Sequence, residues 1–242
     1  MELWYFQKGF NYSQDGPGNR LVYHLCACNL RCPWCSNPEG MKRYEQNAKH
    51  MSVEDAAKAV ISARPMYFEG GGLTLTGGEA TVQFDAVKEL LSRVREAGVN
   101  TCIETNASHP SLQELFPLLD TLIADFKHPS DELHKKWTGI GNDQIKRNLK
   151  SASEYGMPLQ IRVPLIHGVN DDDAAMEGFR EFFSSINRQG MTVEFLRYHE
   201  YGKEKWEKLG LLYQMENAFV SEERAQAFEK ACREAGVSVV RT

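Results

Sequence analysis

The sequence of 242 residues lacks a long apolar run, a low-complexity stretch and a block of like charge. No segment approaches the about 20 apolar residues that a transmembrane helix needs. The amino terminus also lacks the basic start, apolar stretch and small-residue cleavage site of a secretory signal. The 28 basic and 33 acidic residues give a net charge of −5 without a basic patch. We therefore expect a cytoplasmic protein with neither a membrane nor a nucleic acid as its partner.

Repeats of fixed period and Pro/Gly-rich linkers are also missing, which predicts a single domain over residues 1–242. A hydrophobic content of 42% and a charged content of 25% are ordinary for a globular chain with a sizeable core. Short β-rich runs alternate with helical periodicity, which favours βα units and a parallel sheet. The expected strands cover 21–27, 73–76, 100–104, 121–125, 159–163 and 192–196. Six such units predict an α/β fold in the form of a partial (β/α)6 TIM-like barrel.

Helix signals agree with this alternation. Ser52 with Asp55 has the pattern of a helix start, and Gly98 follows an apolar helical face as a helix stop. Near the carboxyl terminus, Phe228 and Cys232 share one face of a further expected helix.

Three of the six cysteines lie in one loop, Cys28-Asn-Leu-Arg-Cys32-Pro-Trp-Cys35. Cysteine thiolates bind iron-sulfur clusters, and a fully ligated cubane cluster takes four of them. Three local thiolates leave one iron without a protein ligand, and open positions in metal sites bind substrate or cofactor. The spacing therefore predicts a cluster held through three irons, with the fourth available for chemistry.

Two other uses of these cysteines remain open. A zinc site would need a second C-x2-C pair, which the sequence lacks, and the histidine pair His128 and His134 lies far beyond the usual spacing. A redox dithiol of Cys32 and Cys35 would leave Cys28 without a role. Cys26 is expected to point off the first strand as a small apolar side chain, and Cys102 and Cys232 are expected to be buried structural thiols.

Candidate polar residues follow the carboxyl ends of the expected strands, where parallel α/β folds collect their chemistry. In chain order they are Cys28, the turn Gly77-Gly78-Glu79, Glu104, the pair Asp125 and Lys127, and Arg162. The two glycines of the turn let the backbone approach a ligand closely.

The C-x3-C-x2-C loop with Trp34 before its last cysteine, together with the Thr-Gly-Gly-Glu-Ala stretch at 76–80, resembles the radical S-adenosylmethionine (SAM) superfamily. This resemblance implies a 4Fe-4S cluster on Cys28, Cys32 and Cys35, with SAM bound at the open iron through its amino and carboxylate groups. It also implies that Glu79 and its two glycines receive the SAM amino group.

Further segments are similar, in the same order, to the glycyl-radical-enzyme activating enzymes typified by the pyruvate formate-lyase activating enzyme. Residues 13–20 resemble a D-G-P-G-x-R segment and 35–39 a variant in which Asn-Pro-Glu follows the last cysteine. Residues 104–106 resemble an acidic-Thr-Asn triplet and 125–127 a D-x-K element. Residues 162–171 resemble an R-x-P-x-x-x-G-x-N-D run and 198–210 a late Y-H-x-x-G-x-x-K element.

This resemblance implies an activase that reductively cleaves SAM and takes a hydrogen atom from a glycine of a partner glycyl radical enzyme. A one-electron reductant such as flavodoxin or ferredoxin would supply the electron. The residues implied in binding or orienting SAM are Trp34, Asn37, Gly77, Gly78, Glu79, Glu104, Asp125, Lys127, Arg162 and His199. The residues implied in contacting the target loop are Asp15, Gly16 and Gly18.

Simpler interpretations exist for several of these residues. Asp125 and Lys127 would form a surface ion pair, Arg162 would pair with a carboxylate, and His199 would be an ordinary half-buried histidine. At the level of the whole chain, one rival is a radical SAM enzyme that modifies a small molecule or a peptide. Another is a zinc-binding adaptor without catalysis.

Two departures from the family pattern stand out. Many relatives carry a ferredoxin-like insert with extra cysteines after the triplet, whereas residues 36–76 contain no cysteine here. The residues before Cys28 read Leu25-Cys26-Ala27, where the family often has Gln-Gly.

Overall fold

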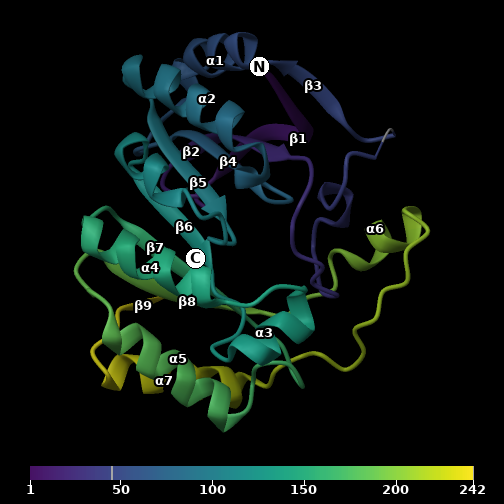
Figure 1. The fold of residues 1–242 in the computed structure, drawn as a ribbon, viewed down its shortest axis with the longest axis vertical. Coiled ribbons are helices and arrows are strands. Elements are labelled where there is room, and N and C mark those ends of the chain that lie inside the picture. Colours follow the sequence, from purple (N-terminus) through teal and green to yellow (C-terminus); the bar gives the residue numbers. More distant parts are fainter. Residues whose placement is uncertain (45, 242) are drawn as a thin grey trace. The chain divides into compact units, whose positions relative to one another are not determined.

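A computed structural model describes residues 1–44 and 46–241 (Figure 1). Residues 45 and 242, which the predicted domain includes, lie outside the described residues. The described chain divides into two compact units. Unit 1 comprises 1–29, 37–105 and 111–123, and unit 2 comprises 30–36, 106–110 and 124–241. The single domain stays a prediction.

The strand order is β3-β1-β2-β4-β5-β6-β7-β8-β9. The strands are β1 (Glu2–Tyr12), β2 (Asn19–Leu25), β3 (Lys49–Ser52), β4 (Gly72–Gly77), β5 (Asn100–Thr105), β6 (Thr121–Asp125), β7 (Leu159–Leu165), β8 (Met191–Arg197) and β9 (Val239–Val240). All six predicted strands are confirmed within a residue or two at each end. The pairs β2–β4, β4–β5 and β7–β8 are parallel, as expected, and β8–β9 is parallel as well. Strands β1, β3 and β9 were not among the six predicted strands, and β1 pairs antiparallel with both β2 and β3.

Helices follow most of the parallel strands. They are α1 (Val53–Ser62), α2 (Phe84–Glu96), α3 (Asp131–Thr138), α4 (Asp143–Tyr155), α5 (Asp173–Ser185), α6 (Lys203–Lys208) and α7 (Glu222–Glu234). Short 3-10 helices are η1 (Pro38–Gly40), η2 (Arg64–Met66), η3 (Ala80–Gln83) and η4 (Leu112–Leu118).

In unit 1, α1 and α2 pack against each other beside the sheet (Figure 1). The predicted start of α1 is confirmed, because the Ser52 hydroxyl accepts a 3.0 Å hydrogen bond from the Asp55 amide. Helix α2 buries Val87, Leu91 and Val94. Gly98 follows α2 with a φ of +72°, a conformation that glycine adopts without steric cost and that ends the helix.

In unit 2, phenylalanine rings fill the core between α5, α7 and the strands. Phe179 lies 5.5 Å from Phe126 and 5.9 Å from Phe183, measured between ring centroids. Phe228 of α7 lies 5.7 Å from Phe195 of β8. The predicted apolar face of α7 is confirmed, since Phe228 and Cys232 are both fully buried there. Such aromatic pairs stabilise a core beyond the area they remove from water.

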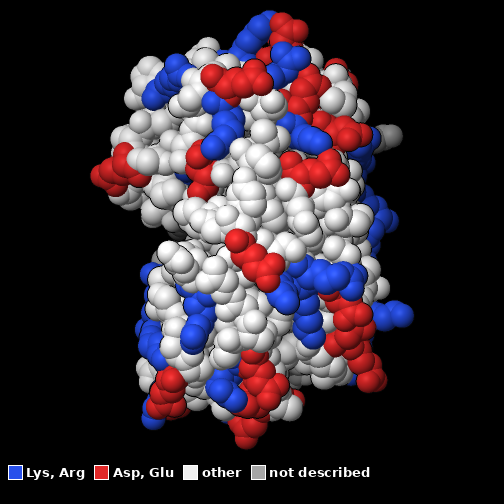
Figure 2. Space-filling view, turned by 60° about the vertical axis from the view of Figure 1, so that its left-hand side comes forward, with Lys and Arg blue, Asp and Glu red and all other residues white. Residues whose placement is uncertain are grey.

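Charges of both signs alternate on the face that Figure 2 shows, without a block of Lys and Arg alone. Among the described residues, no helix combines the length and apolar character that a bilayer crossing requires.

Candidate functional site

In unit 1, the Gly-Gly-Glu turn after β4 is bonded to the residues just before Cys28. The Gly78 amide donates to the Leu25 carbonyl at 2.8 Å, and the Glu79 amide donates to the Ala27 carbonyl at 2.8 Å. Because β2 and β4 are parallel neighbours, both chain segments leave the sheet at the same edge. The structure therefore brings this turn and the first cysteine side by side.

The two glycines of the turn are required for different reasons. Gly77 has a φ of +123°, which residues with a side chain rarely adopt. At Gly78 the reason is space, because a Cβ would lie 2.2 Å from the Gly40 carbonyl oxygen and 2.3 Å from the Ala27 carbonyl oxygen. The turn is thus a close-packed backbone platform on which Glu79 is mounted.

Glu79 is 2% exposed and is held by threonines that the sequence reasoning missed. Its Oε1 accepts hydrogen bonds from the Thr81 amide at 2.9 Å, the Thr81 hydroxyl at 2.5 Å and the Thr105 hydroxyl at 2.6 Å. On the next strand, Glu104 accepts a 2.7 Å bond from the Thr76 hydroxyl. Both predicted carboxylates therefore lie at the carboxyl edge of β4 and β5 with fixed orientations.

Ala27, directly before Cys28, has a φ of +76°. This is the left-handed region, in which a Cβ is crowded and glycine is favoured. The conformation gives a physical meaning to the departure noted above, because the family often has glycine at this position. The Cys28 amide is bonded to the Met41 carbonyl at 3.2 Å.

Asn37 caps η1 in the same unit, and its carbonyl accepts a 2.9 Å bond from the Gly40 amide. The role of Asn37 toward SAM stays a prediction.

The Asp-Gly-Pro-Gly segment forms a turn between β1 and β2, at the amino end of β2, whereas Cys28 follows the carboxyl end. The fully buried Arg20 fixes this turn by donating to the Pro17 carbonyl at 3.0 Å and to the Leu73 carbonyl at 2.7 Å. The Asp15 carbonyl accepts a 2.7 Å bond from the Thr74 hydroxyl. A Cβ on Gly18 would lie 2.3 Å from the Phe68 carbonyl oxygen.

These contacts give the turn a structural role. Target-loop contact by Asp15, Gly16 and Gly18 stays a prediction.

In unit 2, Cys32 and Cys35 are joined by a tight turn in which the Cys35 amide donates to the Cys32 carbonyl at 3.2 Å. Trp34 is 8% exposed, and its ring centroid lies 6.3 Å from that of Trp137 in α3. The sequence reasoning missed Trp206 of α6, whose Nε1 donates to the Cys35 carbonyl at 2.9 Å.

Two of the simpler interpretations correspond to ion pairs in the structure, one at Asp125 and Lys127 and one at Arg162. Lys127 pairs with Asp125 at 2.7 Å. Arg162 Nε pairs with the buried Glu194 at 3.0 Å, so this guanidinium has a carboxylate partner within the protein. Roles of these residues toward SAM stay predictions.

His199 lies against Tyr201, with ring centroids 4.2 Å apart. Burial lowers the pKa of His199, because removal from water disfavours the charged imidazolium. The site therefore presents a half-buried histidine in which the neutral form is favoured.

None of the six cysteines forms a disulfide, so each keeps the reduced sulfur that can bind iron. The predicted burial of Cys102 and Cys232 is confirmed, and Cys26 is buried as well. Burial raises the pKa of Cys232 to about 12.

Cys28 belongs to unit 1, and Cys32 and Cys35 belong to unit 2. Within residues 1–44 and 46–241, no three His, Cys, Asp or Glu side chains are gathered closely enough to hold a metal ion. Convergence of the three thiols on one cluster stays a prediction.

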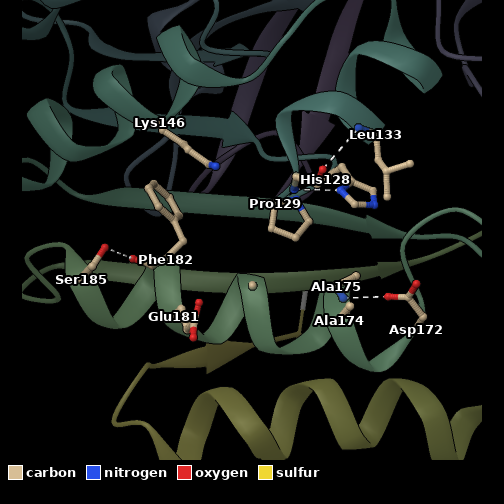
Figure 3. A pocket seen from close by; sticks show the side chains of 12 residues that line it. His128, Pro129, Leu133, Lys146, Asp172, Ala174, Ala175, Glu181, Phe182 and Ser185 are labelled. Atoms are coloured by element: carbon tan, nitrogen blue, oxygen red, sulfur yellow. Dashed lines mark hydrogen bonds between the residues drawn. The ribbon is translucent and has the colours of Figure 1, made fainter.

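A separate cavity of about 510 Å³ lies in unit 2 between the start of α3, α4 and α5 (Figure 3). Its lining includes His128, Lys146, Asp172 and Phe182, and it includes none of the predicted site residues. His128 is 3% exposed, and its Nδ1 accepts a 3.0 Å bond from the Ser130 amide. Burial lowers the pKa of His128.

The chain is similar to known proteins over most of its length. Residues 22–177 match the family model of the Radical SAM superfamily. A pyruvate formate-lyase-activating enzyme of Staphylococcus epidermidis is 33% identical over 213 residues, which cover 84% of each chain. A (2S)-3-sulfopropanediol dehydratase activating enzyme of Klebsiella oxytoca is 30% identical, with 86% of this chain and 85% of the relative covered. That alignment spans 270 positions, more than the 242 residues of this chain, so the Klebsiella relative carries additional residues.

Solved structures share the fold. A domain of a pyruvate-formate lyase-activating enzyme from Bacteroides vulgatus matches with a TM-score of 0.59 at 24% identity, covering 70% of this chain and 98% of that chain. Streptococcus suis SuiB bound to S-adenosylmethionine matches with a TM-score of 0.63 at 18% identity, covering 90% of this chain and 49% of that chain. These similarities, with the family match, confirm the predicted α/β partial-barrel fold.

Proposed function

Because this chain belongs to the radical SAM superfamily and, within it, to the glycyl-radical-enzyme activating enzymes, we propose that it activates a partner enzyme by forming a glycyl radical there. Enzymes of this superfamily use a 4Fe-4S cluster and SAM. We propose that Cys28, Cys32 and Cys35 hold that cluster.

In the proposed reaction, a 4Fe-4S cluster on Cys28, Cys32 and Cys35 would supply one electron, taken from a reductant such as flavodoxin or ferredoxin, for the reductive cleavage of the C5′–S bond of SAM. The 5′-deoxyadenosyl group released from methionine would take a hydrogen atom from a glycine Cα of the partner. The products would be methionine, 5′-deoxyadenosine and a glycyl radical.

The protein's part in this chemistry is to bind and orient. Glu79 gives the main support for SAM binding, because it is a buried carboxylate whose Oε1 accepts hydrogen bonds from Thr81 and Thr105. It follows the two glycines of the turn that is hydrogen-bonded to the residues just before Cys28. A carboxylate fixed in this way suits a charge-assisted hydrogen bond from the SAM amino group. Glu104, Asn37, Arg162 and His199 are proposed to orient the rest of SAM. No side-chain general base is needed.

The donor set fits the cluster, because the three cysteines lie within eight residues of chain and none of them is tied up in a disulfide. We expect Cys32→Ala to abolish both the brown absorbance of the anaerobically reconstituted protein and SAM cleavage, since a cluster needs its thiolate ligands. Cys232→Ala is the matched control, since that thiol is buried in α7, and it should keep both properties. A Cys32→Ala protein that still cleaves SAM reductively would refute the ligand assignment.

The partner is identified by electron paramagnetic resonance. The reconstituted protein is mixed with candidate glycyl radical enzymes, SAM and a reductant, and a glycine-centred doublet is the expected signal. SAM cleavage without a doublet in any mixture, but with a modified small molecule or peptide, would favour the alternative radical SAM function. Equimolar zinc with little iron or sulfide after anaerobic purification would contradict all of the proposed catalysis.

A further inference from the structure

The backbone of Cys35 is contacted by residues 167 to 171 positions later in the chain. Trp206 Nε1 donates a 2.9 Å hydrogen bond to the Cys35 carbonyl oxygen. The same bond lies entirely within unit 2, where Trp206 is 9% exposed. The bond is part-buried, and loss of its donor would cost free energy wherever water cannot replace it.

Gly202 contacts the same carbonyl by a different means. Its φ of −79° is open to any residue, so the reason for glycine here is space. A Cβ at this position would lie 2.5 Å from the Cys35 carbonyl oxygen and 2.9 Å from the Ser36 Cα. Only glycine lets the start of α6 approach the cysteine loop closely enough for Trp206 to reach it.

Trp206 is itself held in place. Its amide donates to the Gly202 carbonyl at 3.1 Å, which fixes the two contacts relative to each other. Its ring packs edge-on against Tyr213 with centroids 5.9 Å apart, and the Tyr213 hydroxyl lies 2.8 Å from the Tyr198 hydroxyl. Tyr198 directly precedes His199, so the segment that holds Cys35 also carries a residue proposed to approach SAM.

We propose that Gly202 and Trp206 form a clamp on the Cys35 carbonyl, and that Trp206 is a positioning residue for the sulfur of Cys35. The positioning role of Trp206 rests on the proposed function, because it treats Cys35 as a cluster ligand. The contacts of Gly202 and Trp206 with the Cys35 carbonyl do not depend on that function. The turn from Cys32 to Cys35 is then fixed from inside by its own hydrogen bond and from outside by the clamp.

The clamp is tested first without any cluster. Trp206→Phe keeps a buried aromatic ring and removes the N–H donor, and the benzothienyl isostere of tryptophan at position 206 removes the donor while keeping the shape. Alkylation of each cysteine is followed by mass spectrometry on the metal-free protein. Loss of one neutral hydrogen bond corresponds to about a fivefold change in the opening equilibrium. We expect Cys35 to react about fivefold faster in both variants, with the rate of the buried Cys232 unchanged.

Trp4→Phe is the matched control, because it makes the same substitution in β1, where the ring stacks on His50 at 4.6 Å. It should leave the Cys35 rate at the wild-type value. In reconstituted protein, both Trp206 variants should release iron to a chelator several-fold faster than the control.

Two failures are distinguishable. Unchanged Cys35 alkylation in the isostere variant would overturn the clamp, even if the wild-type protein holds a cluster and cleaves SAM. The other failure combines faster Cys35 alkylation in the Trp206 variants with a wild-type protein that never binds a cluster. That result would support the clamp's geometry and refute the proposed function, and with it the role of Trp206 in positioning a ligand.

Discussion

Ala27 shows how one residue before the cysteine loop stores conformational strain. Its φ of +76° costs a residue with a Cβ about 1–2 kcal/mol, while a glycine would lose about 0.4–1 kcal/mol through the entropy of the unfolded chain. We therefore expect Ala27→Gly to leave the free energy of unfolding unchanged or to raise it by up to about 1 kcal/mol. Urea denaturation of the metal-free protein measures this.

The control for this residue is Ala231→Gly in the interior of α7. Glycine in a helix interior should lower the free energy of unfolding by about 1 kcal/mol. If Ala27→Gly destabilises the protein as much as Ala231→Gly does, the left-handed conformation of Ala27 is wrong.

Among the elements, the turn between β4 and η3 leaves no room for a Cβ at Gly78. Gly78→Ala would push a Cβ into the backbone carbonyls of Gly40 and Ala27, which cannot move as a flexible side chain can. We expect a loss of at least about 2 kcal/mol in the free energy of unfolding, as for other overpacked sites. Denaturant midpoints of the metal-free protein provide the measurement.

Gly9→Ala in β1 is the matched comparison, because nothing lies within 4 Å of the Cβ that it would add. It should be neutral or slightly stabilising. Equal midpoints for Gly78→Ala and Gly9→Ala would show that the turn is looser than described.

At the scale of the molecule, two buried histidines tie stability to pH. Burial is the main cause that lowers the pKa of both His128 and His134 below the ordinary value of 6.5. The unfolded chain then binds more protons than the folded one as pH falls through 6.5, so the stability is complete above this pH and is lost below it. The urea concentration at the unfolding midpoint should decrease as the pH is lowered from 7.5 to 5.5.

The slope of that fall identifies the groups. His134→Gln removes one titrating group and should flatten the dependence, whatever its effect on stability at neutral pH. A slope that His134→Gln leaves unaltered would assign the pH dependence to other groups.

Local patterns predicted much of this molecule, because six strands and the residues at their ends follow from short apolar runs and their flanks. Strand β1 was missed because its second half is exposed and carries no clear alternation. The contact of Thr105 with Glu79 joins residues 26 positions apart, and the contact of Trp206 with Cys35 joins residues 171 positions apart. Long-range contacts of this kind leave no periodic signal, so the sequence predicted the acidic and sulfur groups but not what orients them.

The position of the Asp-Gly-Pro-Gly turn has one consequence for recognition. Within unit 1, β2 separates this turn from Cys28 by about 20 Å, given the rise per residue of a strand. A polypeptide that touches Asp15 would therefore have to reach along the length of β2 before its reactive glycine met the chemistry. Docking strength and radical transfer would then be separately tunable, with changes at the turn altering how tightly a partner is captured and leaving the electron path intact.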